Sequence, residues 1–308
     1  MYGLPDFDDG QRSDYLSLSA QELLLASSRS SLHAQVHCAL QIGYFKAKHA
    51  FFHFTWDAAR EDCSFVLTRY FNDQAFEPQP ITKYERYAQC TTIAELFGYR
   101  LWSADLLPQL ALYAAHIVRR DVTPSFIVAE LIAYLNEHKA IRPGYTTLQT
   151  LIGEALTAER RRLGGLLADA LDESARDALA QLLVREETLS ELAALKQDAK
   201  DFGWRQMARE RQKRAKLEQL YRIAKALLPS LAISQQNLHY YAGLANFYTV
   251  YDLRRLKAEQ TNLYLLCYVW QRYRQLTDNL VDALGYHMKR LEDESKTRID
   301  KHFMAEQI

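Results

Sequence analysis

Aromatic and cationic side chains come together near the end of one apolar segment. Residues 32–52 carry apolar side chains at steps of three and four, which is the spacing of one face of a helix. Within this segment lie Tyr44, Lys46, Lys48 and His49, and further aromatics follow at Phe51, Phe52, Phe54 and Trp56. Cations beside aromatic rings suit a phosphate backbone and its sugars. Taken alone, the segment is first an ordinary amphipathic helix with solvated lysines, and the alternative that its composition allows is a nucleic-acid contact.

Two pairs of histidines have a spacing that could bind a metal ion. His33 and His37 lie four residues apart, as do His49 and His53, and this spacing places two imidazoles on one face of a helix. Neither pair has a third protein ligand nearby in the sequence, whereas a zinc site needs at least three. We therefore expect no metal site and interpret these histidines as helix-surface or DNA-proximal residues.

The sequence carries no recognisable catalytic motif. It contains no G-x-S-x-G, H-E-x-x-H, Walker or G-x-G-x-x-G pattern, and its acidic residues show no pairing that differs from solvated helix charges. We expect no enzymatic activity and no cofactor.

Three further groups of cations could follow a phosphate backbone. The first group, at the end of a predicted helix, is Arg160 and Arg161. The second forms a stripe in the basic segment 200–225 and consists of Arg205, Arg209 and Lys213. The third lies on a turn and consists of Arg254 and Arg255. Exposed helices often carry solvated charges of this kind, so a simple charged face is the alternative.

The elements that would position these residues are helices. Only 11 Gly and 7 Pro occur in 308 residues, and Leu and Ala recur at helical spacing. Capping boxes at Ser19 and Thr82 begin two helices, and Thr146 with Gln149 predicts a third. This third helix follows another across the turn at residues 141–145, as in a helix-turn-helix with a long connection, although plain helical hairpins look similar. We predict an all-α fold, a multi-lobed array of short helix-turn-helix-like bundles.

Length and composition set the organisation and the setting. A chain of 308 residues usually divides, and we predict lobes at 1–121, with a hinge at the prolines of 77–80, at 122–200 and at 201–308. Lys plus Arg equals Asp plus Glu at 38 each, so net charge excludes neither nucleic acid nor protein partners. The four cysteines are isolated, and no apolar run is long enough for a membrane helix. We expect a cytoplasmic protein, associated with a bacterial nucleoid, that does not enter membranes.

Five segments in the same order resemble the N-terminal region of transposases of the Tn-three family of replicative transposons. YGLPDF lies near the start, and HAQVHCALQIGYFK is similar to the family's NRLGxALQLxxLR pattern. YERYAQCTTIAELFGYR and RPGYTTLQTLI resemble two further family patterns, and a weaker likeness covers residues 237–291. The chain departs from the family at residues 34–35, where Asn-Arg is common, and at residues 91–92, where basic residues or histidine occur.

This resemblance implies helical modules that bind double-stranded DNA at the transposon's terminal inverted repeats. It implies that the acidic catalytic triad belongs to a domain beyond these residues, so this chain has no catalytic activity of its own. The candidate DNA contacts that match the family are Lys46, Lys83, Tyr84, Arg86, Tyr99, Arg100, Arg142, Thr146 and Thr147. With the departures at residues 34–35, Tyr44, Lys46 and Lys48 are expected to brace the backbone more than to read bases.

The sequence thus predicts a DNA-binding part of a transposase that acts in DNA transposition and recombination, with a homodimer left open. The alternative is an all-helical protein-interaction module or a truncated regulator of transposition.

Overall fold

The computed structural model describes residues 3–72, 74–186, 189–201 and 203–306, and these residues form two compact units. Unit 1 comprises Met1–Ala114 and Val128–Ile152, and unit 2 comprises Ala115–Ile127 and Gly153–Ile308. The predicted all-α fold is confirmed, because the one sheet in the described part is a two-residue antiparallel pair of β1 (Arg185–Glu186) and β2 (Leu189–Ser190). The three predicted lobes remain a prediction.

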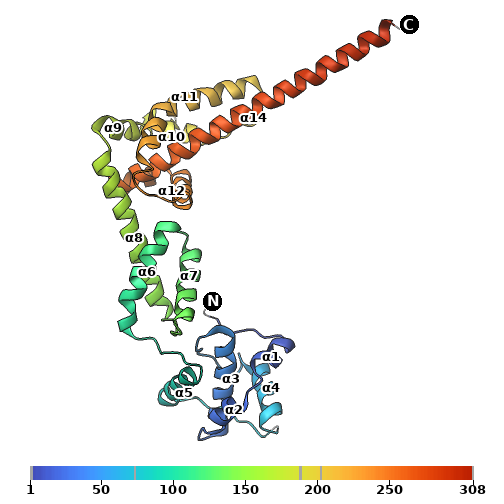
Figure 1. Ribbon diagram of the computed structural model, residues 1–308, viewed down its shortest axis with the longest axis vertical. Coiled ribbons are helices and arrows are strands. Elements are labelled where there is room, and N and C mark those ends of the chain that lie inside the picture. The colour runs from blue at the N-terminus through green and yellow to red at the C-terminus, as the bar shows by residue number, and fades with distance from the viewer. Residues whose placement is uncertain (1–2, 73, 187–188, 202, 307–308) are drawn as a thin grey trace. The chain divides into compact units, whose positions relative to one another are not determined.

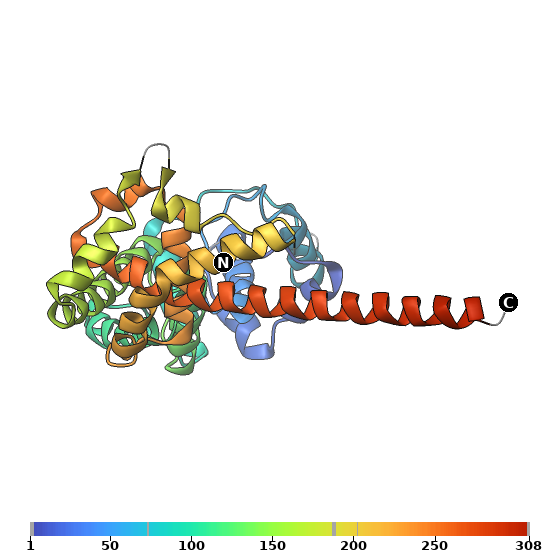
Figure 2. The same cartoon turned by 90° about the horizontal axis from the view of Figure 1, so that it is seen from above.

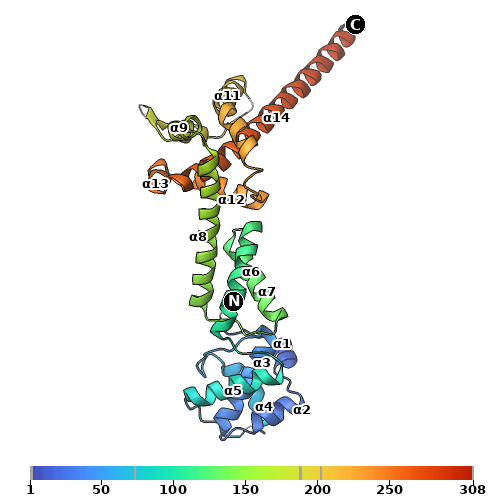
Figure 3. The same cartoon turned by 60° about the vertical axis from the view of Figure 1, so that its left-hand side comes forward.

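Unit 1 is built around α3 (Leu32–Lys48). It packs against α1 (Asp9–Tyr15), α2 (Ala20–Ser27), α4 (Arg60–Tyr70) and α5 (Lys83–Leu96), as Figure 3 shows. Every residue of α3 from Val36 to Phe45 is buried, including polar Gln41. An amphipathic helix buries one face, so this continuous burial means that neighbours surround the middle of α3.

A buried hydrogen-bond network joins α1, α3 and α4. The Tyr44 hydroxyl donates to Asp62 Oδ2 at 2.8 Å, and Arg12 Nε donates to Asp62 Oδ1 at 2.8 Å. The helices approach closely at Gly43, where an added Cβ would lie 2.2 Å from a methyl carbon of Leu16. A larger residue at position 43 would therefore separate α3 from the chain that follows α1.

The predicted helix 32–52 ends earlier than its apolar pattern indicates. Lys48 is the last residue of α3, and His49 adopts a left-handed conformation with φ 48°. The chain then runs without helix through Phe54. This turn sends the aromatics after His49 back over the core and leaves Lys48 at the exposed end of the helix.

The ends of α5 follow the predicted local chemistry in part, because Thr82 caps the helix whereas the Glu85 carboxylate accepts from Gln89 Nε2 and does not complete the predicted capping box. Thr82 Oγ1 accepts a hydrogen bond from the Glu85 backbone N–H at 3.1 Å, and Gly98, with φ 69°, follows the C-terminus. Left-handed backbone is strained for residues with a Cβ, so glycine is favoured there. The prolines of residues 77–80 lie in a non-helical connection before this helix.

The boundary between the units divides three helices, α6 (Leu107–Arg120), α7 (Pro124–Glu137) and α8 (Tyr145–Ala170), and the short 3-10 helix η1 (Ala104–Leu106) precedes α6. The helix expected to start at Thr146 begins at Tyr145, so Thr146 lies inside its first turn and does not cap it. In unit 1, the ring of Tyr113 stacks on Tyr134 with centroids 4.3 Å apart.

Unit 2 contains α9 (Glu173–Gln181), α10 (Glu191–Leu195), α11 (Trp204–Leu227), α12 (Gln235–Phe247), α13 (Val250–Arg255) and α14 (Ala258–Glu306). α11 and α12 pack along the first part of α14, and α14 continues well past them (Figures 1 and 2). Arg272 of α14 is buried and donates to the backbone oxygens of Leu195 and Gln197 and to Asp198, each at 2.7–2.8 Å. A buried charge needs such partners, so Arg272 holds the end of α10 and the residues that follow it against α14.

Within the described residues, none of the helices is both long enough and apolar enough to cross a lipid bilayer.

Candidate nucleic-acid interface

A short backbone pairing in unit 1 brings two distant segments together. The Arg100 N–H donates to Lys139 O at 2.9 Å, and the Ile141 N–H donates to Arg100 O at 2.9 Å, which forms a parallel bridge between Arg100 and Ala140. Arg100 therefore lies in this backbone pairing and Arg142 lies just after it, although the two residues are far apart in the sequence. The pairing follows Gly98, whose left-handed turn directs the chain away from α5.

Beside this ladder, the end of α3 carries a stacked pair of rings. Tyr99 lies flat against His49, with centroids 5.3 Å apart and an interplanar angle of 22°, and its other contact is an edge interaction with Phe45. Burial lowers the pKa of His49 below its usual 6.5, so its ring is uncharged at neutral pH. His49 thus supplies a planar support for Tyr99, and the positive charge comes from its neighbours.

Four cations lie on the segments that the ring stack and the backbone ladder bring together. Lys48 directly precedes His49 and is exposed, and the exposed Arg100 directly follows Tyr99. Lys139 Nζ lies near Gly98, 3.6 Å from the position that a Cβ there would take. The Arg142 guanidinium lies 5.8 Å from the ring centroid of Phe52, close enough for a cation–π contact. We call this set the basic surface: Lys48, His49, Tyr99, Arg100, Lys139 and Arg142.

Tyr44 is removed from the candidate contacts. Its side chain is completely buried, and the pKa of its hydroxyl is raised by burial and by the neighbouring Asp62. A side chain with no exposed surface cannot contact a phosphate, so Tyr44 is a core residue. Lys46 is half-buried, and its Nζ donates to Ser17 O at 2.7 Å and lies 3.4 Å from Glu22. Its charge therefore serves an internal contact.

The candidates on α5 occupy its first turns. Lys83 and Tyr84 are exposed, and Tyr84 has 88% of its surface accessible. Arg86 is half-buried, and its Nη1 donates to His53 Nδ1 at 3.0 Å. Arg86 therefore faces the loop after α3, whereas Tyr84 is open to a partner.

The paired threonines follow the basic surface along the chain. Thr146 is exposed and Thr147 is half-buried, both in the first turn of α8. Free backbone N–H groups at a helix N-terminus favour anions. This end of α8 could therefore attract an anion, and Arg142 lies a few residues before it.

In unit 2, Arg160 and Arg161 line a shallow hollow of about 210 Å³ together with Lys257. Arg161 is exposed, whereas Arg160 is half-buried and its Nε donates to Leu156 O at 3.2 Å. This group holds three cations beside one carboxylate, that of Glu259.

The arginines of α13 make contacts within unit 2. Arg254 donates to Leu183 O, and Arg255 lies 5.5 Å from the ring centroid of Tyr251. Both remain exposed in part, so their charges are accessible.

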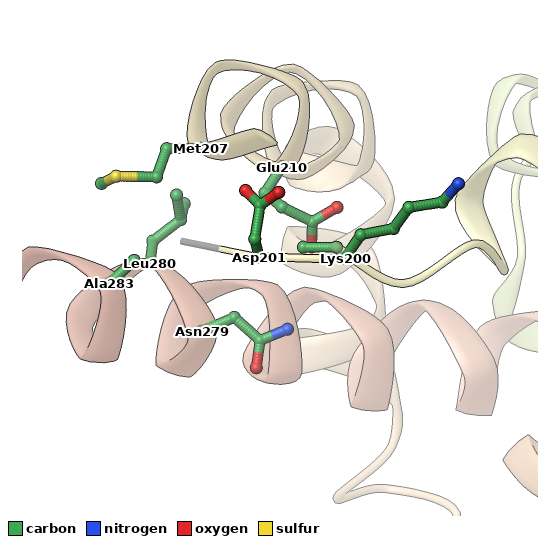
Figure 4. A pocket seen from close by; sticks show the side chains of 8 residues that line it. Lys200, Asp201, Met207, Glu210, Asn279, Leu280 and Ala283 are labelled. Atoms are coloured by element: carbon green, nitrogen blue, oxygen red, sulfur yellow. The ribbon is translucent and has the colours of Figure 1, made fainter. Parts of the chain in front are cut away.

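The predicted stripe on α11 is only partly cationic. Arg205 and Arg209 are exposed, but Lys213 Nζ donates to Gln197 O at 2.6 Å and to Glu210 at 2.8 Å. Figure 4 shows the carboxylates of Glu210 and Asp201 close together in a pocket of about 280 Å³ between α11 and α14. Lys213 is therefore engaged by Glu210 within unit 2, and the exposed cations of the stripe are Arg205 and Arg209.

Metal coordination was one reading of the histidine pairs. In the described ranges, no group of three His, Cys, Asp or Glu residues is arranged to hold a metal ion. His37 is instead buried and hydrogen-bonded to Gln89, and His53 is paired with Arg86.

Two contributors to the basic surface were not among the predicted contacts. Lys139 lies in the turn after α7 with a left-handed φ of 47°, and its approach to Gly98 depends on the Arg100–Ala140 bridge. Nothing in the sequence near Lys139 signals this. His49 lies in the aromatic and cationic segment at residues 44–56, but its stacking on Tyr99 is a tertiary contact that the sequence pattern does not predict.

The chain was compared with known proteins. A search of the curated proteins found no match. Residues 1–155 match a family described as a domain of unknown function, DUF4158. The matched residues cover just over half of the 308, and they include all of the basic surface. The chain therefore belongs to the DUF4158 family.

Proposed function

We propose that this chain binds double-stranded DNA at the terminal inverted repeats of a Tn-three family transposon, as a non-catalytic part of a transposase. The observation that carries the proposal is the basic surface. Its cations, Lys48, Arg100, Lys139 and Arg142, come from three separate segments, which the stack of His49 on Tyr99 and the bridge from Arg100 to Ala140 hold together.

The chemistry of this surface suits a duplex backbone. Lysine ammonium groups neutralise phosphates as point charges, and arginine can donate two parallel hydrogen bonds to a phosphate or to guanine. Arg142 rests against Phe52, so its guanidinium plane is oriented before a ligand arrives. The second support for the proposal is the collinear resemblance to replicative transposases, which implies that the bound DNA is the terminal inverted repeats.

Selection from a pool of random-sequence duplexes tests the proposal without assuming the recognised site. The enriched sequence should match the inverted repeats that flank the gene, and binding of this duplex should exceed that of a scrambled duplex. If about six to ten phosphates are neutralised, affinity should fall by about three to five decades between 50 and 200 mM salt. Weak binding to both duplexes, insensitive to salt, would overturn the proposal.

A second candidate function, that of a protein-interaction module, is favoured by α14. From Val281 onward, this helix exposes apolar side chains at alternating steps of three and four. They are Val281, Leu284, Met288 and Leu291, each more than half exposed. This is the spacing of a coiled-coil seam, and pairs such as Arg290–Glu294 and Lys296–Glu292 stabilise the helix along its length.

We infer that a second copy of α14 covers this seam in a homodimer. Size-exclusion chromatography with light scattering should give about twice the chain's 35.7 kDa without DNA. Leu284→Lys should return the protein to a monomer, because it places two cations in the seam. A monomeric wild-type chain across micromolar concentrations would contradict the dimer and leave the DNA-binding proposal intact.

A further inference from the structure

A second feature of unit 1 is a pocket of about 500 Å³ next to the basic surface. It lies between the loop after α3, the proline-containing connection before α5, and α5 itself. Small-molecule sites have volumes of roughly 300–1,000 Å³, so this pocket has a suitable size for a ligand. Its lining includes His37, His53, Phe54, Trp56, Pro80 and Arg86.

His37 gives the pocket a defined hydrogen-bond acceptor. Gln89 Nε2 donates to Ala34 O at 3.1 Å and to Glu85 at 2.9 Å, so its amide orientation is fixed and its Oε1 faces His37. Oε1 can only accept, so His37 Nδ1, 2.7 Å away, carries the proton. Burial lowers the pKa of His37, which keeps the ring neutral at pH 7. His37 Nε2 is therefore a lone-pair acceptor.

This acceptor has no hydrogen-bond partner among the residues that the structure describes. His37 is only 6% exposed, and it lines the pocket. Because His37 lines the pocket, Nε2 is available to accept a hydrogen bond from a donor on a ligand. A ligand that uses this acceptor presents an N–H or O–H group to Nε2.

The remaining walls are planar and apolar. Phe54 stacks on His37 with centroids 5.0 Å apart, and Trp56 lies with its edge toward both rings. Trp56 Nε1 donates to Gln79 O at 3.0 Å, so the indole is fixed and its N–H is already used. Such walls accept a flat aromatic ring.

The rim carries a cation. Arg86 Nη1 donates to His53 Nδ1, and Arg86 has further N–H donors in its guanidinium group. The acidic Asp57 on the rim is paired with Arg60 at 2.9 Å, which balances its charge. The pocket therefore combines flat aromatic walls, a hydrogen-bond acceptor at His37 Nε2 and a cation at its rim, Arg86.

The geometry points to one unpaired nucleobase of a DNA strand as the occupant, its amino group donating to His37 Nε2 and its phosphate meeting Arg86. The base lies among Phe54, Trp56 and His53, where aromatic stacking stabilises any base. Phe52 connects this pocket to the basic surface, because it lines the pocket and also contacts Arg142. The inference rests on the proposed DNA binding, since a bound duplex delivers the base.

Ligand-observed NMR tests the pocket without a duplex. The full chain should bind deoxyadenosine monophosphate, and the analogue in which purine replaces adenine should bind about tenfold more weakly, because it lacks the amino donor. Trp56→Leu should abolish binding. Tyr87→Leu is the matched control, since Tyr87 is an exposed aromatic of α5 outside the pocket, and this variant should bind as the wild type does.

A second arm uses duplexes with one unpaired adenine or one abasic site at the same scanned position. The unpaired adenine should increase affinity at one position, and Arg86→Gln, a substitution at the rim, should remove this gain even if Trp56→Leu fails to fold. Equal binding of both nucleotides, or nucleotide binding retained in Trp56→Leu, would overturn the inference. Nucleotide binding without any duplex binding would instead overturn the proposed function and keep the pocket.

Discussion

Tyr99 lies flat against His49, fifty residues earlier in the chain, with ring centroids 5.3 Å apart. This stack fixes the segment after α5 against the end of α3, and the bridge from Arg100 to Ala140 adds the turn after α7. The rings thus hold in place the backbone from which the surrounding cations extend.

Lys46 and Lys48 should behave differently, although they are two residues apart. Lys48→Ala should weaken binding to all duplexes alike and reduce the salt slope by about one, because one phosphate contact is lost. Lys46→Ala should leave DNA binding unchanged and lower the free energy of unfolding by about 1 kcal/mol, since Nζ contacts Ser17 O and Glu22. Fluorescence anisotropy at several salt concentrations and urea unfolding measure the two effects. A loss confined to the cognate repeat in Lys48→Ala would contradict this view.

Arg142→Lys should separate geometry from charge. Lysine keeps the positive charge but loses the planar guanidinium that lies over Phe52. We therefore expect affinity for the cognate duplex to fall by roughly three- to tenfold, while the slope of affinity against salt stays the same. Arg142→Gln should reduce both. A reduced salt slope in the lysine variant would show that orientation is not what Arg142 contributes.

Local chemistry predicted the helices and their ends better than it predicted the site. Thr82 and Gly98 mark the limits of α5 because capping and left-handed turns depend on a few neighbouring residues. Tyr44 shows the limit of such reasoning. Its spacing beside Lys46 looks like a surface, but its ring contacts Phe7, Phe52 and Phe54 and its hydroxyl donates to Asp62 of α4. The approach of Lys139 to Gly98 requires the whole of unit 1 to be folded.

Asn237 should be important for the stability of unit 2. It is fully buried, its Oδ1 accepts from the Val122 N–H at 2.8 Å, and its Nδ2 donates to Val118 O at 2.8 Å. Its side chain therefore provides hydrogen-bond partners for backbone groups at the C-terminal end of α6. Asn237→Ala should lower the free energy of unfolding by about 2–3 kcal/mol, because it leaves buried backbone groups unpaired. Asn246→Ala, at an exposed position of the same helix, should change it by less than about 0.5 kcal/mol. Similar urea midpoints for the two variants would refute this role.

His37 should make the protein less stable in mild acid. Burial lowers its pKa in the folded state below the usual 6.5, and Arg86 and His53 act in the same direction, whereas Gln89 and Glu85 oppose it. Below pH 6.5 the unfolded chain therefore binds a proton that the folded chain does not.

The sign of the effect follows from this difference in bound protons. The contribution of His37 is complete above pH 6.5 and is lost as the pH falls from there toward the folded pKa, with a slope of up to about 1.4 kcal/mol per pH unit. His49, whose pKa is also lowered, adds to the same trend. Urea unfolding between pH 5 and pH 7.5 should show a shallower dependence in His37→Gln, because glutamine can donate to Gln89 but does not titrate. An unchanged pH profile in this variant would mean that His37 takes up its proton equally well in the folded state.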